Sequence, residues 1–214
     1  MSDMRTEEEQ IEAIKNWWKE NGTQTIVAVV LVVGGWFGYQ GYQSQKQATA
    51  EQASAVYQSM LEISESKTEE DLGRRAQLLD QLKNEYSGTP YAQFAALFKA
   101  KDAVEAKDYD AAIAELTYVK ESAADEALVH LANVRLARVL NELGRGEEAL
   151  AVLNVEKQGA FAFNYLEAKG DVLFKLGREA EARDAYTLAK AEGLKINADQ
   201  SVLELKLADL AVTE

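Results

Sequence analysis

His130 is the single histidine of the chain, and it follows Glu126 by four residues in a stretch with helical spacing. A catalytic or metal site would need further groups converging on the imidazole, and one Glu-His pair supplies too few. The sequence therefore predicts a structural role for His130 on the surface face of a helix, with no metal site.

Adjacent carboxylates occur in Glu7-Glu8-Glu9 and in Glu147-Glu148, and each group opens a predicted helix. Acidic side chains near a helix N-terminus complement its dipole, so we interpret both groups as structural charges. Gly144-x-Gly146 predicts a turn and not a phosphate loop, because no strand precedes it and no Lys-Ser/Thr pair follows. These patterns indicate a protein that is not an enzyme and has no catalytic residue or cofactor.

The elements around these residues are predicted to be helices throughout. The chain has 214 residues with a single proline, Pro90, and it is rich in Ala, Leu, Glu and Lys, which favours an all-α fold. Its 36 acidic and 23 basic residues give a net charge of −13, with no basic block of the kind that neutralises phosphates. Nucleic acid is therefore excluded as a partner, and an acidic domain is expected to favour basic partner surfaces.

Residues 26–42 form the most apolar stretch, IVAVVLVVGGWFGYQGY. A bilayer core of about 30 Å needs about 20 helical residues, which residues 23–42 supply. Aromatic side chains that prefer the headgroup zones flank the stretch: Trp17, Trp18, Trp36, Tyr39 and Tyr42. We predict a segment before the membrane at residues 1–22, a transmembrane helix at 23–42 and a folded domain at 43–214.

Two alternatives to a transmembrane anchor stay open at this point. One is a buried helix of a soluble protein. The other is a cleavable signal peptide, because Ala48-Thr49-Ala50 resembles a cleavage site, although the preceding region is long and acidic.

Basic residues near the apolar stretch predict its orientation. Arg5, Lys15 and Lys19 precede it, whereas Lys46 alone follows within twenty residues. Positive charge collects on the cytoplasmic side of membrane proteins. We therefore expect a bacterial inner-membrane protein that spans the bilayer once, with a cytoplasmic N-terminus and a periplasmic domain.

Short patterns predict how the N-terminal region is arranged. Residues 7–20 have amphipathic helical spacing, with Thr6 as a predicted N-cap and Asn21-Gly22 as a stop signal. Gly34-x-x-x-Gly38 predicts a close contact with another membrane helix. Beyond the span no Pro or Gly occurs between residues 42 and 73, so the spanning helix is expected to continue into the domain.

The remaining sequence repeats itself with a period near 34 residues, which is typical of tetratricopeptide repeats. Leu-Gly at Gly144 and Gly177 is predicted to end one helix where a side chain would obstruct the turn, and small residues at Ala112, Ala149 and Ala182 allow close helix crossing. After a helix at 72–86 and a helix start at Thr89-Pro90, three pairs are predicted: 91–105 with 109–122, 125–143 with 146–158, and 161–176 with 179–192. A cap at 198–212 follows.

The chain resembles the YfgM-like family of ancillary subunits of the SecYEG translocon over essentially its whole length. The resemblance rests on residues 7–22, EEEQIEAIKNWWKENG, on the Gly-containing span after them, and on LARV at residues 136–139. It implies a single-span inner-membrane protein with a periplasmic tetratricopeptide-like domain that associates with SecYEG and the chaperone PpiD and assists exported client proteins. It supplies no catalytic motif.

A second function remains open from the sequence. The same architecture suits an adaptor of another cell-envelope assembly or of a stress-signalling complex. In both cases the lipid bilayer and other proteins are the expected partners.

Overall fold

The computed structural model describes residues 7–66 and 68–212, and all regular elements in these residues are helices. The elements are α1 (Glu7–Glu62), α2 (Glu69–Glu85), α3 (Pro90–Glu105), α4 (Tyr109–Ser122), α5 (Glu126–Glu142), α6 (Gly146–Leu153), the 3₁₀ turn η1 (Gly159–Phe161), α7 (Ala162–Lys175), α8 (Glu179–Lys195) and α9 (Ser201–Val212). The all-α prediction is confirmed. The chain divides into two compact units, Met1–Glu51 and Gln52–Glu214, which are described separately.

The helix α1 is continuous over 56 residues, so the predicted stop at Asn21-Gly22 is wrong. The Asn21 amide donates to the Trp17 carbonyl at 3.1 Å and does not cap a helix end. Gly22 faces the Trp18 indole, whose ring atoms would lie 3.2 Å from a Cβ at this position. Unbroken helix also satisfies the backbone hydrogen bonds where the apolar stretch begins. The predicted cap Thr6 lies outside the described residues.

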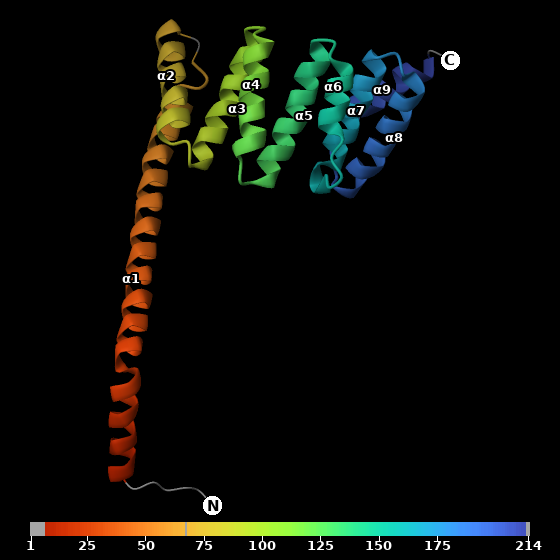
Figure 1. Ribbon diagram of the computed structural model, residues 1–214. Helices are drawn as coiled ribbons and strands as arrows, with labels where there is room; N and C mark the ends of the chain where they lie inside the picture. Colours follow the sequence, from red (N-terminus) through yellow and green to blue (C-terminus); the bar gives the residue numbers. More distant parts are fainter. Residues whose placement is uncertain (1–6, 67, 213–214) are drawn as a thin grey trace, which may run out of the picture. The chain divides into compact units, whose positions relative to one another are not determined.

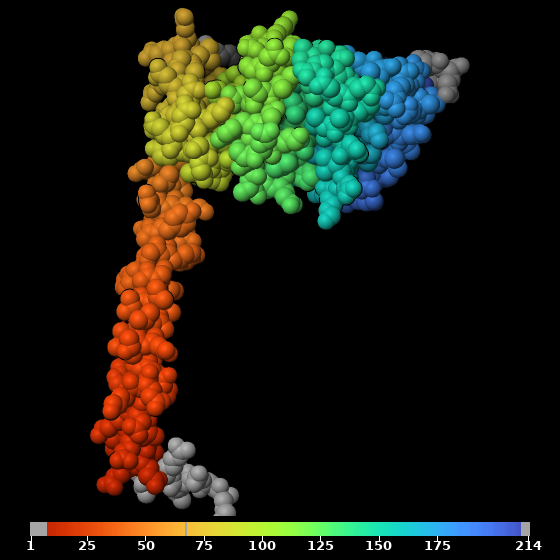
Figure 2. Space-filling view, in the orientation of Figure 1, coloured from red at the N-terminus to blue at the C-terminus, as the bar shows by residue number. Residues whose placement is uncertain are grey.

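The apolar stretch of α1 is exposed on all sides within the described chain. Leu31 and Val32 are 70% and 72% exposed, and their apolar neighbours are similarly uncovered, as Figure 2 shows for one face. In the described residues α1 is the one helix long and apolar enough to cross a membrane. A helix buried in the chain's own core is therefore excluded.

In the second unit the helices from α2 to α9 follow one another as antiparallel neighbours (Figure 1). Each of the three predicted helix pairs is present, as α3 with α4, α5 with α6, and α7 with α8, and α9 is the cap. The predicted extension of α6 to residue 158 is wrong. The chain leaves the helix at Asn154, and the Val155 amide donates to the Leu153 carbonyl at 2.9 Å, which a helix does not permit.

Thr89 occupies the N-cap position of α3, with Pro90 in the first turn, as the sequence predicts. Its hydroxyl, however, donates to the Tyr86 carbonyl at 2.8 Å and makes no cap bond. Thr89 therefore satisfies the end of α2 instead of the start of α3.

Every first helix of a pair ends in the same left-handed turn. Gly144 and Gly177 have φ of 77° and 75°, and no atom of the described residues crowds a Cβ built on either within 4 Å. The expectation that a side chain would obstruct the turn is therefore wrong, since the constraint is the positive φ. Lys107 adopts the same conformation with φ of 60°, and the next amide, of Asp108, bonds to the Ala103 carbonyl at 2.8 Å, as in a Schellman motif.

The core of the second unit runs along the stacked helices as three groups of buried side chains. The first group packs the last turns of α1 on α2 and α3, through Ala53, Met60, Leu79, Leu82 and Ala95. The largest group fills the space between α3 and α7 and includes fully buried Ala112, Ala149 and Tyr165. The third joins α7 and α8 to α9 and includes Ala182. The end of α1 is thus part of the repeat core.

Candidate protein-binding pocket

A pocket of about 540 Å³ opens between α3 and α5 in the second unit. Its floor is mostly aromatic and aliphatic, and charged side chains stand at its rim. The lining residues are Tyr57, Phe94, Leu97, Phe98, Ala100, Lys101, Val104, Glu105, Leu116, Arg135, Arg138 and Val139. Its volume suffices for large side chains of a partner.

Tyr57, near the end of α1, forms one wall of the pocket. Its ring centroid lies 5.7 Å from that of Phe94, 6.4 Å from that of Phe98 and 5.4 Å from that of Tyr91. Tilted and edge-on contacts at these distances are favourable for aromatic rings. Burial, followed by the neighbouring Tyr91, raises the pKa of the Tyr57 hydroxyl, so this wall stays neutral.

The rim of the pocket is basic although the chain is acidic. Arg135 and Arg138 are three residues apart on α5 and share one face, and the structure gives Arg135 no ion pair within the described residues. Burial, and then the charge of Arg138, lowers the pKa of Arg135. Lys101 and Glu105 form only a loose pair at 3.6 Å, with both side chains 64% exposed. The rim therefore has an excess of positive charge.

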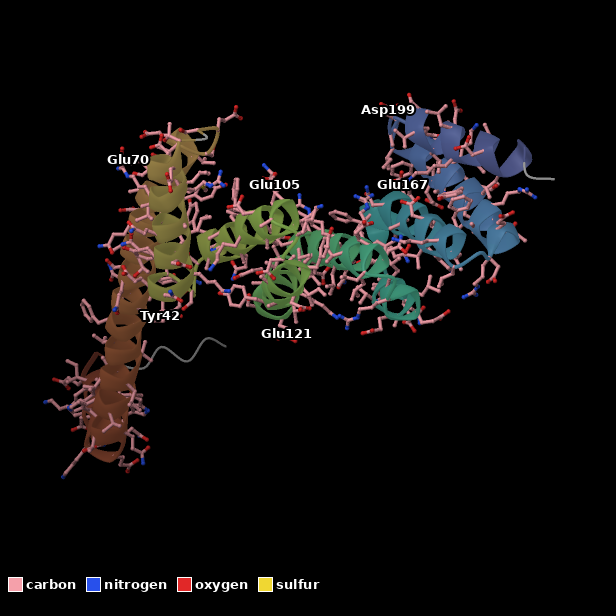
Figure 3. The ribbon with its side chains drawn as sticks, turned by 90° about the horizontal axis from the view of Figure 1, so that it is seen from above. Tyr42, Glu70, Glu105, Glu121, Glu167 and Asp199 are labelled. Atoms are coloured by element: carbon pink, nitrogen blue, oxygen red, sulfur yellow. The ribbon has the colours of Figure 1, made fainter. Side chains whose placement is uncertain are left out.

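Acidic residues appear beyond the pocket, along α7. Glu167 accepts from Arg138 at 3.3 Å and from Lys206 at 2.9 Å, and Lys206 also pairs with Asp171 at 2.7 Å. In Figure 3, Glu105 and Glu167 lie on one side of the stacked helices, whereas Glu121 at the end of α4 lies on the opposite side. Glu105, which lines the pocket, is therefore on the same side of the helices as Glu167.

Sequence reasoning did not identify Tyr57, Arg135 and Arg138 as site residues. The sequence nevertheless contained a signal for the two arginines. When the repeats are aligned on the left-handed residues Lys107 and Gly144, Arg135 takes the position equivalent to Phe98, and Arg138 that equivalent to Lys101. Equivalent positions on successive helices of a solenoid lie side by side. Charge at such positions, and not the net charge of the chain, indicates the character of the groove.

The residues predicted for membrane and helix contacts are exposed in α1. Trp17 and Trp18 are each 52% exposed, and more than half of the surface of each of Trp36, Tyr39 and Tyr42 is exposed as well. In the part of the chain that the structure describes, no side chain or other helix lies within 4 Å of a Cβ built on Gly34 or Gly38, so another helix could approach both positions closely. These roles stay predictions.

His130 belongs to a half-buried polar group between α5 and α7 and not to a surface pair with Glu126. Its Nδ1 lies 3.0 Å from the Tyr165 hydroxyl, which also accepts from the Asn133 amide at 3.1 Å, and the Phe161 ring lies 5.1 Å from the imidazole. No group of three or more acidic, His or Cys side chains in the described residues could hold a metal ion.

The carboxylates of α6 bind arginines in the turns. Glu148 accepts two bonds of 2.7 Å from Arg145, and Glu147 lies 3.5 Å from Arg178. The bond from Arg145 is the main cause that lowers the pKa of Glu148. Glu8 and Glu9 are exposed at the start of α1.

Known proteins resemble the chain over most of its length. Residues 15–212 match the model of the tetratricopeptide repeat-like domain, so the apolar helix lies within the matched region. The chain is 33% identical to the ancillary SecYEG translocon subunit of Haemophilus influenzae, over 95% of this chain and 97% of that protein. The proteins of the same name from Aggregatibacter actinomycetemcomitans and Escherichia coli are 31% and 28% identical, over 95% and 96% of this chain and 97% of each relative. No solved structure matches. Near full-length similarity, one apolar helix and a stack of helix pairs together place the chain in the family of ancillary SecYEG translocon subunits.

Proposed function

We propose that this protein is a membrane-anchored scaffold that associates with the SecYEG translocon through α1 and its repeat domain. One observation carries the proposal, which is the near full-length similarity to relatives that are named for this association. The fold agrees with it, because a helical-repeat domain offers a long binding surface.

The finer proposal is that the repeat domain works at the periplasmic exit of the channel, together with the chaperone PpiD, and assists exported proteins there. It rests on the resemblance of residues 7–22 and of the repeats to the family. The exposed aromatic residues Trp17, Trp18, Trp36, Tyr39 and Tyr42 would then lie in the two headgroup zones.

Copurification tests the association. The tagged full chain, extracted from its own membranes in a mild detergent, should retain SecYEG and PpiD above the level of an unrelated single-span protein. A chain that retains neither would contradict the proposal. Retention of SecYEG without PpiD would remove only the second partner.

We further propose that Gly34 and Gly38 form the surface at which a helix of the complex contacts α1. Both positions are open for close backbone approach. Gly34→Leu with Gly38→Leu should weaken SecYEG copurification, whereas Val29→Leu with Val32→Leu, at positions at least about 120° around the helix from both glycines, should have little effect. Equal effects would argue against a specific contact.

The proposed orientation can be tested because the chain has no cysteine. Glu12→Cys and Glu121→Cys place single thiols at exposed positions before and after the apolar stretch. A membrane-impermeant maleimide should label the thiol at 121 in spheroplasts and the thiol at 12 only after lysis. The opposite pattern would reverse the orientation.

A further inference from the structure

The pocket between α3 and α5 combines features that select its occupant. Its floor is apolar, with the Tyr57, Phe94 and Phe98 rings close together, so it favours large apolar side chains. A groove of this composition in a chain of net charge −13 would be expected to have acidic edges. The edges instead carry three basic side chains, Lys101, Arg135 and Arg138, and one acidic side chain, Glu105.

The two arginines are available to a ligand. Arg135 has no carboxylate partner in the described part of the chain, and the side chain of Arg138 remains 49% exposed despite its 3.3 Å contact with Glu167. Two guanidinium groups three residues apart on a helix repel each other, and a carboxylate placed between them would relieve this repulsion. Guanidinium groups also bind carboxylates through paired, charge-assisted hydrogen bonds.

We propose that this pocket binds an acidic peptide segment of a partner protein, with a large apolar side chain on the aromatic floor and a carboxylate against Arg135 and Arg138. The inference rests on the proposed function in that the partner is a protein met at the membrane. The positive charge of the rim favours an acidic segment. This is the opposite of the basic partners that the net charge of the chain predicts.

The test uses the full chain in detergent micelles and three fluorescein-labelled peptides of equal length. The first carries two Glu beside a Phe and a Leu, the second has Lys in place of Glu, and the third has Ser in place of Phe and Leu. Fluorescence anisotropy should give the first peptide at least about tenfold higher affinity than either of the others at low salt, and the difference should fall as salt rises. Equal affinities for the Glu and Lys peptides, or a preference for Lys, would overturn the proposal.

A matched pair of variants locates the site. Arg135→Gln with Arg138→Gln should remove most of the preference for the acidic peptide. The control Arg74→Gln with Lys120→Gln makes the same change in net charge at exposed positions on α2 and α4 and should keep the preference. If both pairs lose it equally, the overall field and not the pocket is responsible, and the proposal fails. Circular dichroism establishes that each variant is folded.

The peptide-binding test and the copurification test can fail independently of each other. A chain that retains SecYEG but shows no preference among the peptides refutes the pocket inference alone. A chain that binds the acidic peptide selectively but retains no SecYEG supports the pocket and refutes the proposed association.

Discussion

Tyr165 supports the middle of the repeat domain through its hydroxyl, and Tyr165→Phe tests this directly. The side chain is 1% exposed, and its oxygen accepts from the Asn133 amide and lies 3.0 Å from Nδ1 of His130. Because the tyrosine oxygen accepts from Asn133, the hydroxyl proton remains available for a hydrogen bond to Nδ1 of His130. Burial raises the pKa of this hydroxyl, so it stays protonated.

The magnitude follows from what the substitution leaves behind. Asn133 is 5% exposed and its Oδ1 has no hydrogen-bond partner among the described residues, so loss of the hydroxyl would leave its amide nitrogen unpaired as well. An unpaired buried polar group costs about 1–3 kcal/mol. For a domain of this size each kcal/mol lowers Tm by about 2–4 °C, so we expect a fall of about 2–12 °C.

The assay is urea and thermal unfolding of the full chain in detergent, followed by far-ultraviolet circular dichroism. Tyr57→Phe is the matched control, because no hydrogen bond to the Tyr57 hydroxyl occurs among the described residues. Adding Asn133→Leu to Tyr165→Phe should recover part of the loss, since an apolar replacement of both partners removes the unpaired groups. If Tyr165→Phe costs no more than Tyr57→Phe, the reasoning is refuted.

Four further substitutions test other features of the fold. Gly170→Ala would place a methyl group against the ring of Tyr186 and should destabilise the fold by about 1–3 kcal/mol. Gly73→Ala in α2, where the added Cβ meets open space, should stabilise the fold by about 0.5–1 kcal/mol. Equal urea midpoints for the two variants would contradict this reasoning. Lys107→Gly should raise the urea midpoint, because a positive φ costs a residue with a side chain about 1–2 kcal/mol and glycine avoids this cost. The greater entropy of glycine in the unfolded chain offsets part of the gain. A lower urea midpoint would refute the strain at Lys107. Hydrogen bonds from Ser66 and Thr68 lower the pKa of Asp71 from its ordinary 3.8. The ionised carboxylate therefore stabilises the fold fully above pH 3.8, and this contribution is lost as the pH falls through the folded pKa. Asp71→Asn should reduce the loss of stability measured between about pH 5 and pH 3, and an unchanged pH dependence would exclude the contribution.

The sequence was sufficient for features that depend on local pattern. The apolar run at 26–42 follows from composition, and the helix pairs follow from a repeat period that brings Gly144 and Gly177 to the same place in successive units. Helix ends that depend on local backbone chemistry were harder to predict. Asn21-Gly22 has the composition of a stop, yet the helix continues through it because the side chains of Asn21 and Trp18 pack along the same helix.

Only the tertiary structure decided which side chains meet. Tyr57, on a helix that begins before the membrane segment, joins Phe94 and Phe98 because the end of α1 packs in the repeat core. His130 and Tyr165 are 35 residues apart and are brought together by the stacking of α5 on α7. The net charge predicted basic partners, but a pocket responds most strongly to the charged side chains that line it. Those are Lys101, Arg135 and Arg138 with one carboxylate, Glu105, which is an excess of positive charge. Local periodicity determines the helices, whereas contacts between distant residues determine the site, because they depend on how the helices pack.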